Sequence, residues 1–155
     1  MPVAKLTSFL DDNNIEYAVI NHSPAYTARE VGATTHVLRR EVAKTVIVKL
    51  GNDMAMAVLP ASRRIDLERL AEAADVEQAT LADESEFEDV FPSCEVGAMP
   101  PFGNLYGMHV YVDEMLTEDD DIVFNACSHS QAIQMSYDDY ARLVEPCVAQ
   151  FAIKE

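Results

Sequence analysis

The segment EVAKTVIVKL (41–50) carries the clearest pattern of hydrophobic positions in the chain, and this pattern predicts a β-strand. Because strand side chains alternate between two faces, Lys44 belongs to an otherwise aliphatic face. The aliphatic members of that face are Val46, Val48 and Leu50. Lys49 belongs to the opposite face, where we expect its charge to meet water. A lysine within an aliphatic row either extends to solvent or is held there for a function, so Lys44 is the first candidate functional residue.

Further hydrophobic runs predict a mixture of strands and helices. Strands are expected at 15–20, 54–60, 109–112, 121–126 and 133–135. Helices are expected over 3–13, after the N-caps Thr27, Asp66 and Ser136, and over about 82–90 with Phe87 buried. Because strands and helices mix without strict βαβ alternation, we predict a single α+β domain, residues 1–155, built on a mixed sheet.

The composition supports a folded domain and narrows its partners. The chain has 155 residues, of which 49% are hydrophobic, which is enough for a substantial core. It carries 27 acidic and 11 basic residues, and the resulting net charge of −16 repels polyanions. The simplest interpretation is a solvated acidic surface that aids solubility or suits a salty cytoplasm. We therefore expect no DNA binding, and only a small local contact with any other nucleic acid.

The apolar runs and the cysteines indicate in which compartment of the cell the protein is found. No run approaches the ~20 residues of a membrane span, and the start MPVAKLTSFLDDNN lacks the apolar centre of a signal peptide. The three cysteines, Cys94, Cys127 and Cys147, are odd in number and form no CxxC motif. We therefore expect a cytoplasmic protein that does not bind a membrane.

Motifs for metal binding or nucleophilic catalysis are missing from the sequence. The four histidines form neither HxxxH nor HExxH, and there is no GxSxG elbow or P-loop. We expect no metal and no cofactor. Cys127 and His129 would lie on one strand face, which is weak evidence for a nucleophile, and a small buried cysteine is the better interpretation.

The segment GAMPPFG (97–103) is a candidate binding loop. Gly97 and Gly103 permit backbone conformations closed to other residues, while Pro100 and Pro101 stiffen the segment. A rigid loop of this kind can hold backbone N–H groups toward the oxygen atoms of a carboxyl ester or an oxyanion. Taken alone, the stretch is better interpreted as a structural turn.

The segment NACSHSQ (125–131) gathers small polar side chains around His129 at the end of an apolar strand. Taken alone, it is better interpreted as a strand that exits into a loop with surface hydroxyls. Together with Lys44 and the 97–103 loop, it suggests a pocket. That pocket would hold one cation, a set of backbone donors and a wall of His, Ser and Asn side chains.

Four motifs, in order along the chain, resemble the YbaK/ProX family, the stand-alone relatives of the editing domain inserted in bacterial prolyl-tRNA synthetases. They are HSPAYTA (22–28), VAKTVIVK (42–49), GAMPPFG (97–103) and NACSHSQAI (125–133). The lysine ahead of the β-branched run and the Gly-x-x-x-Pro loop are the most specific of them. The resemblance spans nearly the whole chain and implies a mixed, strongly curved and partly barrel-like sheet flanked by helices.

The resemblance also implies an activity and a set of site residues. Relatives hydrolyse, in trans and without metal, the ester that joins a wrong amino acid to the 3′ end of tRNA. The catalytic positions of the family fall on Lys44, which would hold the terminal nucleotide or the aminoacyl carbonyl, on Gly97 and on His129. Eight further residues of the motifs are expected substrate contacts: His22, Tyr26, Thr45, Met99, Pro101, Phe102, Asn125 and Ser128. Cys127 departs from the glycine of many relatives, which leaves the size of the pocket open.

Two classes of function remain open from the sequence. The favoured class is a trans-editing aminoacyl-tRNA deacylase, a carboxylic ester hydrolase that serves translation fidelity. The other is a binding module of the same fold that recognises an aminoacyl or nucleotide ligand, or a partner protein, without hydrolysing it. The expected partners are the mischarged 3′ acceptor end of tRNA and an aminoacyl-tRNA synthetase that supplies further affinity. Alanine, serine, cysteine, threonine and a non-protein analogue all fit as the amino acid.

Overall fold

The main sheet is mixed and has five strands. The structure, a computed structural model, describes residues 4–21, 42–87, 89–90, 94, 98–118, 120–128 and 130–154. The strands of the main sheet are β2 (Ala43–Leu50), β3 (Asp53–Pro60), β5 (Ala79–Leu81), β6 (His109–Asp113) and β9 (Cys147–Ala149), in the order β5-β2-β3-β6-β9. The β3–β6 and β6–β9 pairs are parallel and the others antiparallel, which confirms the predicted mixed sheet.

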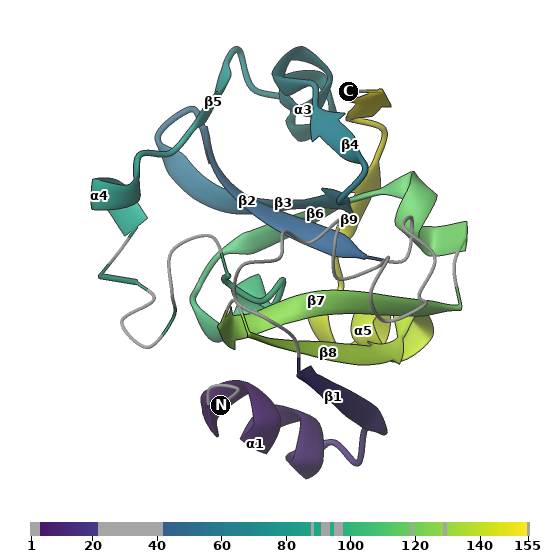
Figure 1. The fold of residues 1–155 in the computed structure, drawn as a ribbon. Coiled ribbons are helices and arrows are strands. Elements are labelled where there is room, and N and C mark those ends of the chain that lie inside the picture. Colours follow the sequence, from purple (N-terminus) through teal and green to yellow (C-terminus); the bar gives the residue numbers. More distant parts are fainter. Residues whose placement is uncertain are drawn as a thin grey trace.

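A second sheet packs against the main one. It is antiparallel, has the order β1-β8-β7, and consists of β1 (Tyr17–Asn21), β7 (Asp121–Ser128) and β8 (Gln131–Ser136). A short third pair joins β4 (Arg63–Ile65) to β10 (Ala152–Lys154). In Figure 1, the strongly bent β2 and β3 run above β7 and β8. The strands therefore form separate curved sheets rather than a closed barrel.

Helices pack against the hydrophobic clusters of these sheets. They are α1 (Ala4–Asp12), α3 (Leu67–Ala74), α4 (Glu84–Phe87) and α5 (Tyr137–Val144), with 3-10 turns η2 (Gly103–Leu105) and η3 (Glu114–Glu118). The predicted caps of two helices are confirmed, because Asp66 accepts from the first-turn amides of α3 and Ser136 accepts from the Asp139 amide in α5. The third predicted cap, Thr27, lies outside the described residues. No helix in the described part of the chain is long and apolar enough to cross a membrane.

The main sheet is buried on both faces, so its strands are apolar on both sides. One face packs against the second sheet through Ile47 and Met56 on the main sheet and Phe124 on β7. The other face, which includes Val48, Leu50 and Leu59, packs against Leu70 of α3 and against Phe151. This arrangement fixes β2 from both sides and so sets the positions of its polar residues.

Asp113, at the end of β6, is a buried carboxylate that is only 3% exposed. Its Oδ1 accepts hydrogen bonds from the amides of Phe151 and Ala152, each at 2.9 Å, and its Oδ2 accepts one from the Met115 amide at 3.0 Å. These bonds satisfy a charge that would otherwise be costly to bury. They also tie the start of β10 to the middle of the main sheet.

Candidate active site

Lys44 lies in the aliphatic row predicted for it. The register of β2 with β3 is unbroken and places Lys44 opposite Leu59. Val48 and Leu50, further along the same face, are buried against α3, and Lys44 itself is half-buried. The alternation inferred from the sequence is thus confirmed, and the lysine stands at the mouth of an apolar surface.

The opposite face of β2 is covered in part. Ile47 on that face is 3% exposed and belongs to the core between the two sheets, whereas Thr45 and Lys49 are half-buried. Lys49 reaches the edge of that core, where its Nζ lies 3.0 Å from Oε2 of Glu86 and its side chain is 35% exposed. The predicted exposure of the Lys49 charge is thus confirmed, and the burial of Ile47 comes from the second sheet, which alternation along one strand does not predict.

The two sheets meet directly beside Lys44. Val42 and Val123 form an isolated parallel bridge between the start of β2 and the middle of β7, and both side chains belong to one small apolar cluster. Lys44 and Asn125 each lie two residues further along the same two strands and point to the same side as these valines. Asn125 is half-buried and pairs across the sheet with Ala132, another member of that cluster. The bridge therefore brings the strand that carries the lysine of the second motif alongside the strand that carries the asparagine of the fourth.

A β-bulge ends β7 inside the NACSHSQ segment. The register with β8 shifts between Asn125 and Ser128, and Cys127 within the bulge has a positive φ of 66°. This is the left-handed region that glycine adopts without cost, which explains why a glycine suits this position in the resembling family. Cys127 has this same backbone conformation. The cysteine in place of the family's glycine therefore changes the side chain at the bulge but not the backbone region of this residue.

The same bulge holds the candidate binding loop. The Cys127 amide donates to the Ala98 carbonyl at 2.8 Å, and Cys127 and Cys94 are joined by a disulfide with their Cα atoms 4.1 Å apart. The sequence alone does not predict this pair. Their separation of 33 residues forms no recognisable motif, and only the fold brings them together.

The loop after Ala98 is anchored in the core. Phe102 is fully buried, and its ring packs edge-on against Tyr140 at a centroid distance of 5.3 Å. The Tyr140 hydroxyl donates to the Pro101 carbonyl at 2.7 Å, and Met99 is 6% exposed. Met99, Pro101 and Phe102 were predicted as substrate contacts, and in this structure their side chains are buried and hold the loop in place.

Gly103 follows the loop and is required for a reason other than the predicted one. Its φ is not in the left-handed region, but a Cβ at this position would lie 2.7 Å from both the Met108 carbonyl oxygen and Cγ2 of Val110. Close approach of η2 to the start of β6, rather than an unusual backbone conformation, therefore excludes a side chain here.

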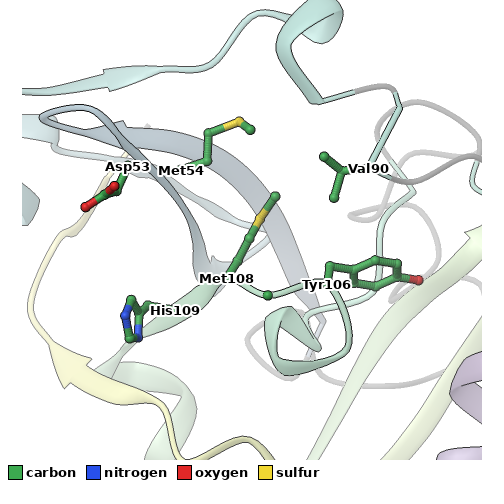
Figure 2. Close-up of a pocket in the computed structure, with 7 residues that line it drawn as sticks. Asp53, Met54, Val90, Tyr106, Met108 and His109 are labelled. Atoms are coloured by element: carbon green, nitrogen blue, oxygen red, sulfur yellow. The ribbon is translucent and has the colours of Figure 1, made fainter.

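A hollow near the β2–β3 hairpin borders this region. It has a volume of about 420 Å³, and Figure 2 shows the side chains that surround it. Its lining consists of Asp53, Met54, Val90, Tyr106, Gly107, Met108 and His109. The Tyr106 hydroxyl lies 3.9 Å from Sγ of Cys127, so one wall of the hollow touches the fourth motif. The sequence does not mark Tyr106 as a site residue, because no local pattern distinguishes it from a core tyrosine.

The remaining predicted site residues are placed only in part. Thr45 is half-buried opposite Val58, on the face of β2 that Lys44 does not share. Ser128 ends β7, and its backbone alone is described. Four predicted residues lie outside the described part of the chain: His22, Tyr26, Gly97 and His129. Within the described ranges, no group of three or more His, Cys, Asp or Glu side chains is arranged to hold a metal ion.

Comparison with known proteins identifies the family. The model of the family described as the aminoacyl-tRNA editing domain matches residues 22–143. The multifunctional Ser/Thr-tRNA deacylase ProXp-y of Escherichia coli (strain K12) is 26% identical over 152 residues, which cover 95% of this chain and 90% of that protein. The same-named protein of Escherichia coli O157:H7 matches equally.

Solved structures share the fold. A hypothetical protein, APE2540, superposes with a TM-score of 0.84 at 19% identity, covering 96% of this chain and 99% of that one. A candidate trans-editing enzyme for prolyl-tRNA synthetase superposes with a TM-score of 0.83 at 14% identity, covering 96% and 95%. At these identities the likeness establishes the fold.

The chain belongs to the aminoacyl-tRNA editing domain family, as its four motifs predicted. It is an aminoacyl-tRNA editing enzyme, a deacylase that hydrolyses mischarged aminoacyl-tRNA.

Proposed function

We propose that the ester bond is cleaved where β2 meets β7, with Lys44 as the central cation. The observation that supports this placement is the Val42–Val123 bridge, which lies two residues before Lys44 on one strand and two residues before Asn125 on the other. Lys44 is a half-buried residue, and a charge near low-dielectric protein is less screened than one in open water, so it can hold a phosphate or polarise a carbonyl more strongly. Asn125 offers a donor and an acceptor on the same side.

Hydrolysis of an aminoacyl ester needs positioning more than covalent help. A water molecule attacks the ester carbonyl, the oxygen gains negative charge, and the ribose oxygen leaves with a proton. In our proposal Lys44 holds the terminal nucleotide or the carbonyl oxygen, and the backbone around Gly97 donates to the developing oxyanion. His129 assists proton transfer, and His22, Tyr26, Thr45 and Ser128 complete the substrate contacts.

The amino acid removed is proposed to be small and hydroxylated. The similar protein in Escherichia coli is named a Ser/Thr-tRNA deacylase and shares 26% of its residues with this chain over nearly its full length. Serine and threonine are therefore the first substrates to test, with alanine as the smaller comparison. Pocket size can discriminate among such side chains only modestly, so we expect overlapping activity on serine and threonine.

The nucleic-acid contact is proposed to be confined to the 3′ acceptor end of the tRNA. A chain with a net charge of −16 has little basic surface for the tRNA body. An aminoacyl-tRNA synthetase, whose partner surface is not assigned, would supply the rest of the affinity. We place this activity in the cytoplasm and in a single domain that spans residues 1–155.

The test is multiple-turnover deacylation of tRNAs mischarged with serine, threonine or alanine. Lys44→Ala should abolish turnover with an unchanged unfolding midpoint, because the lysine stands at the mouth of the apolar row. Lys49→Ala is the matched control, since its side chain points to the other face and pairs with Glu86. Equal loss of turnover in both variants, or unfolding of Lys44→Ala at much lower denaturant, would contradict the assignment to Lys44.

A further inference from the structure

Cys94 and Cys127 bring a disulfide to the edge of the proposed site. Cys127 occupies the bulge of β7, two residues after Asn125, and is 3% exposed. Cys94 lies ahead of the candidate binding loop and is partly exposed. The third cysteine, Cys147, is exposed on β9 and unpaired.

The short segment from Cys94 to Ala98 has both of its ends attached to one residue. At one end the sulfur of Cys94 is bonded to that of Cys127, and at the other the Ala98 carbonyl accepts a hydrogen bond from the Cys127 amide at 2.8 Å. Gly97, the proposed oxyanion donor, lies between these ends in the sequence. Without the disulfide, only the Ala98 end remains attached to Cys127.

We propose that Cys94 and Cys127 form a reversible disulfide that sets the rate of the deacylation reaction, with the bridged form the faster. The inference rests on the proposed role of the Gly97 loop. A loop held at both ends has already lost the freedom that it would otherwise lose at the transition state, so its backbone donors are positioned in advance.

The chemistry of the switch is thiol–disulfide exchange with a small-molecule disulfide. The partly exposed Cys94 thiolate attacks one sulfur of that disulfide and releases the first small thiol. Cys127 then attacks the Cys94 sulfur, the internal bridge forms and the second small thiol leaves. The two protons of the cysteine thiols pass to the two departing thiolates. A dithiol reductant reverses the reaction.

The experiment compares the two redox forms of one preparation. The protein is treated with oxidised glutathione or with dithiothreitol and then transferred to thiol-free buffer, so that no reagent attacks the ester. Alkylation followed by peptide mass mapping determines which cysteines are blocked. In the bridged form only Cys147 should be alkylated, whereas all three cysteines should be alkylated after reduction.

We expect kcat for seryl-tRNA or threonyl-tRNA to be at least about fivefold higher in the bridged form, which corresponds to the cost of ordering about one backbone residue. Cys94→Ser should show the lower rate in both buffers. Cys147→Ser is the matched control and should keep the full response. Equal kcat for the two verified forms, or failure of the bridge to form under oxidant, would overturn the proposal.

A second measurement separates this proposal from the proposed function. Hydrogen exchange of the peptide that covers 95–102 should be faster after reduction in the wild type and unaffected by redox state in Cys94→Ser. If neither form hydrolyses any mischarged tRNA but exchange responds to reduction, the catalytic role is wrong and the tether is real. If exchange is the same in both forms, the tether does not fix the loop and the switch is excluded.

Discussion

The Tyr140 hydroxyl, on α5, donates a hydrogen bond of 2.7 Å to the Pro101 carbonyl in the candidate binding loop. Both groups are buried, so neither can exchange this bond for one with water. The bond connects a helix that begins after β8 to a loop that precedes β6. Tyr140 is therefore a positioning residue for the loop, and a substitution there should act on catalysis through Pro101.

Tyr140→Phe should lower both stability and turnover. It removes only the hydroxyl and leaves the Pro101 carbonyl buried without its donor, which costs about 1–3 kcal/mol of unfolding free energy. We expect the substitution to disturb the position of the loop more than it weakens substrate binding, so kcat should fall by a larger factor than KM rises. Tyr137→Phe on the same helix is the control. Kinetics and urea unfolding of both variants check this, and an unchanged kcat in a destabilised Tyr140→Phe would make the bond purely structural.

Alkaline pH should weaken the fold through the same residue. Burial raises the pKa of Tyr140 well above its ordinary value of 10.0, so the native state holds the proton to higher pH than the unfolded chain does. Its contribution to stability is complete below about pH 10 and is lost as pH rises beyond it. Unfolding midpoints at about pH 8 and pH 10.5 should therefore differ more for the wild type than for Tyr140→Phe. A parallel decline in the two proteins would exclude Tyr140 as the source.

Gly103→Ala should destabilise the connection between the loop and β6. The added Cβ would meet the Met108 carbonyl oxygen and Val110 at 2.7 Å, and relief requires movement of backbone. Overpacking of this kind costs about 1–3 kcal/mol. Asn104→Ala, at the next position and exposed, should change unfolding by less than about 0.5 kcal/mol. Thermal denaturation of the two variants compares them, and equal stability would show that η2 can shift freely.

The Lys49–Glu86 ion pair should contribute to stability in a way that is lost at acidic pH. The hydrogen bond from Lys49, followed by that from the Asp83 amide, lowers the pKa of Glu86, so its contribution to stability is present above the unfolded value and lost as pH falls through the native one. Lys49→Met should raise the pKa of Glu86 toward its ordinary value and flatten this acid loss. Carboxyl-carbon NMR titration measures the shift, with Lys154→Met as a control. An unmoved Glu86 titration would mean that the Asp83 amide alone sets its pKa.

The salt dependence of deacylation tests how much of the tRNA is contacted. If only the aminoacylated 3′ end enters, few phosphates are neutralised, and log K should fall by only ~0.7 per neutralised phosphate for each decade of salt. A mischarged minihelix should then be cleaved at a rate comparable to that of full tRNA. A steep slope, equivalent to many phosphates, would instead indicate that the fold or an assembly creates a basic patch that the net charge of −16 conceals.

The regular elements with strong patterns were predictable from sequence, and the short ones were not. The alternation around Lys44, the helix caps Asp66 and Ser136, and the burial of Phe87 all depend on neighbours within a few residues, which sequence displays directly. The strands at 63–65, 79–81, 147–149 and 152–154 have three residues each, too few for a period to emerge. These short strands form only because neighbouring strands in the fold pair with them.

The site residues divide in the same way. The sequence assigns Lys44 and Asn125 to strands, because each lies in a segment with a clear alternating pattern, and the structure places both residues on strands, β2 and β7. Their proposed role in one pocket stays a prediction. The Tyr140–Pro101 bond and the Cys94–Cys127 pair join residues that are distant in sequence, and no local pattern encodes them. Burial of Phe102 was equally hidden, since an aromatic residue beside two prolines suits a pocket wall as well as a core.

The Val42–Val123 bridge has a consequence for how the enzyme folds. Its two residues come from distant parts of the chain, and the parallel β3–β6 pairing likewise spans a long connection. Both pairings therefore require the chain to lose the entropy of closing a long loop before their stabilising contacts form. Local hairpins such as β2–β3 can form early, whereas the contact between Val42 and Val123 forms only when the two sheets dock. Because the proposed site lies at this contact, we expect a newly made chain to acquire its secondary structure before its activity. Stopped-flow refolding should show deacylation returning after the far-ultraviolet circular dichroism signal.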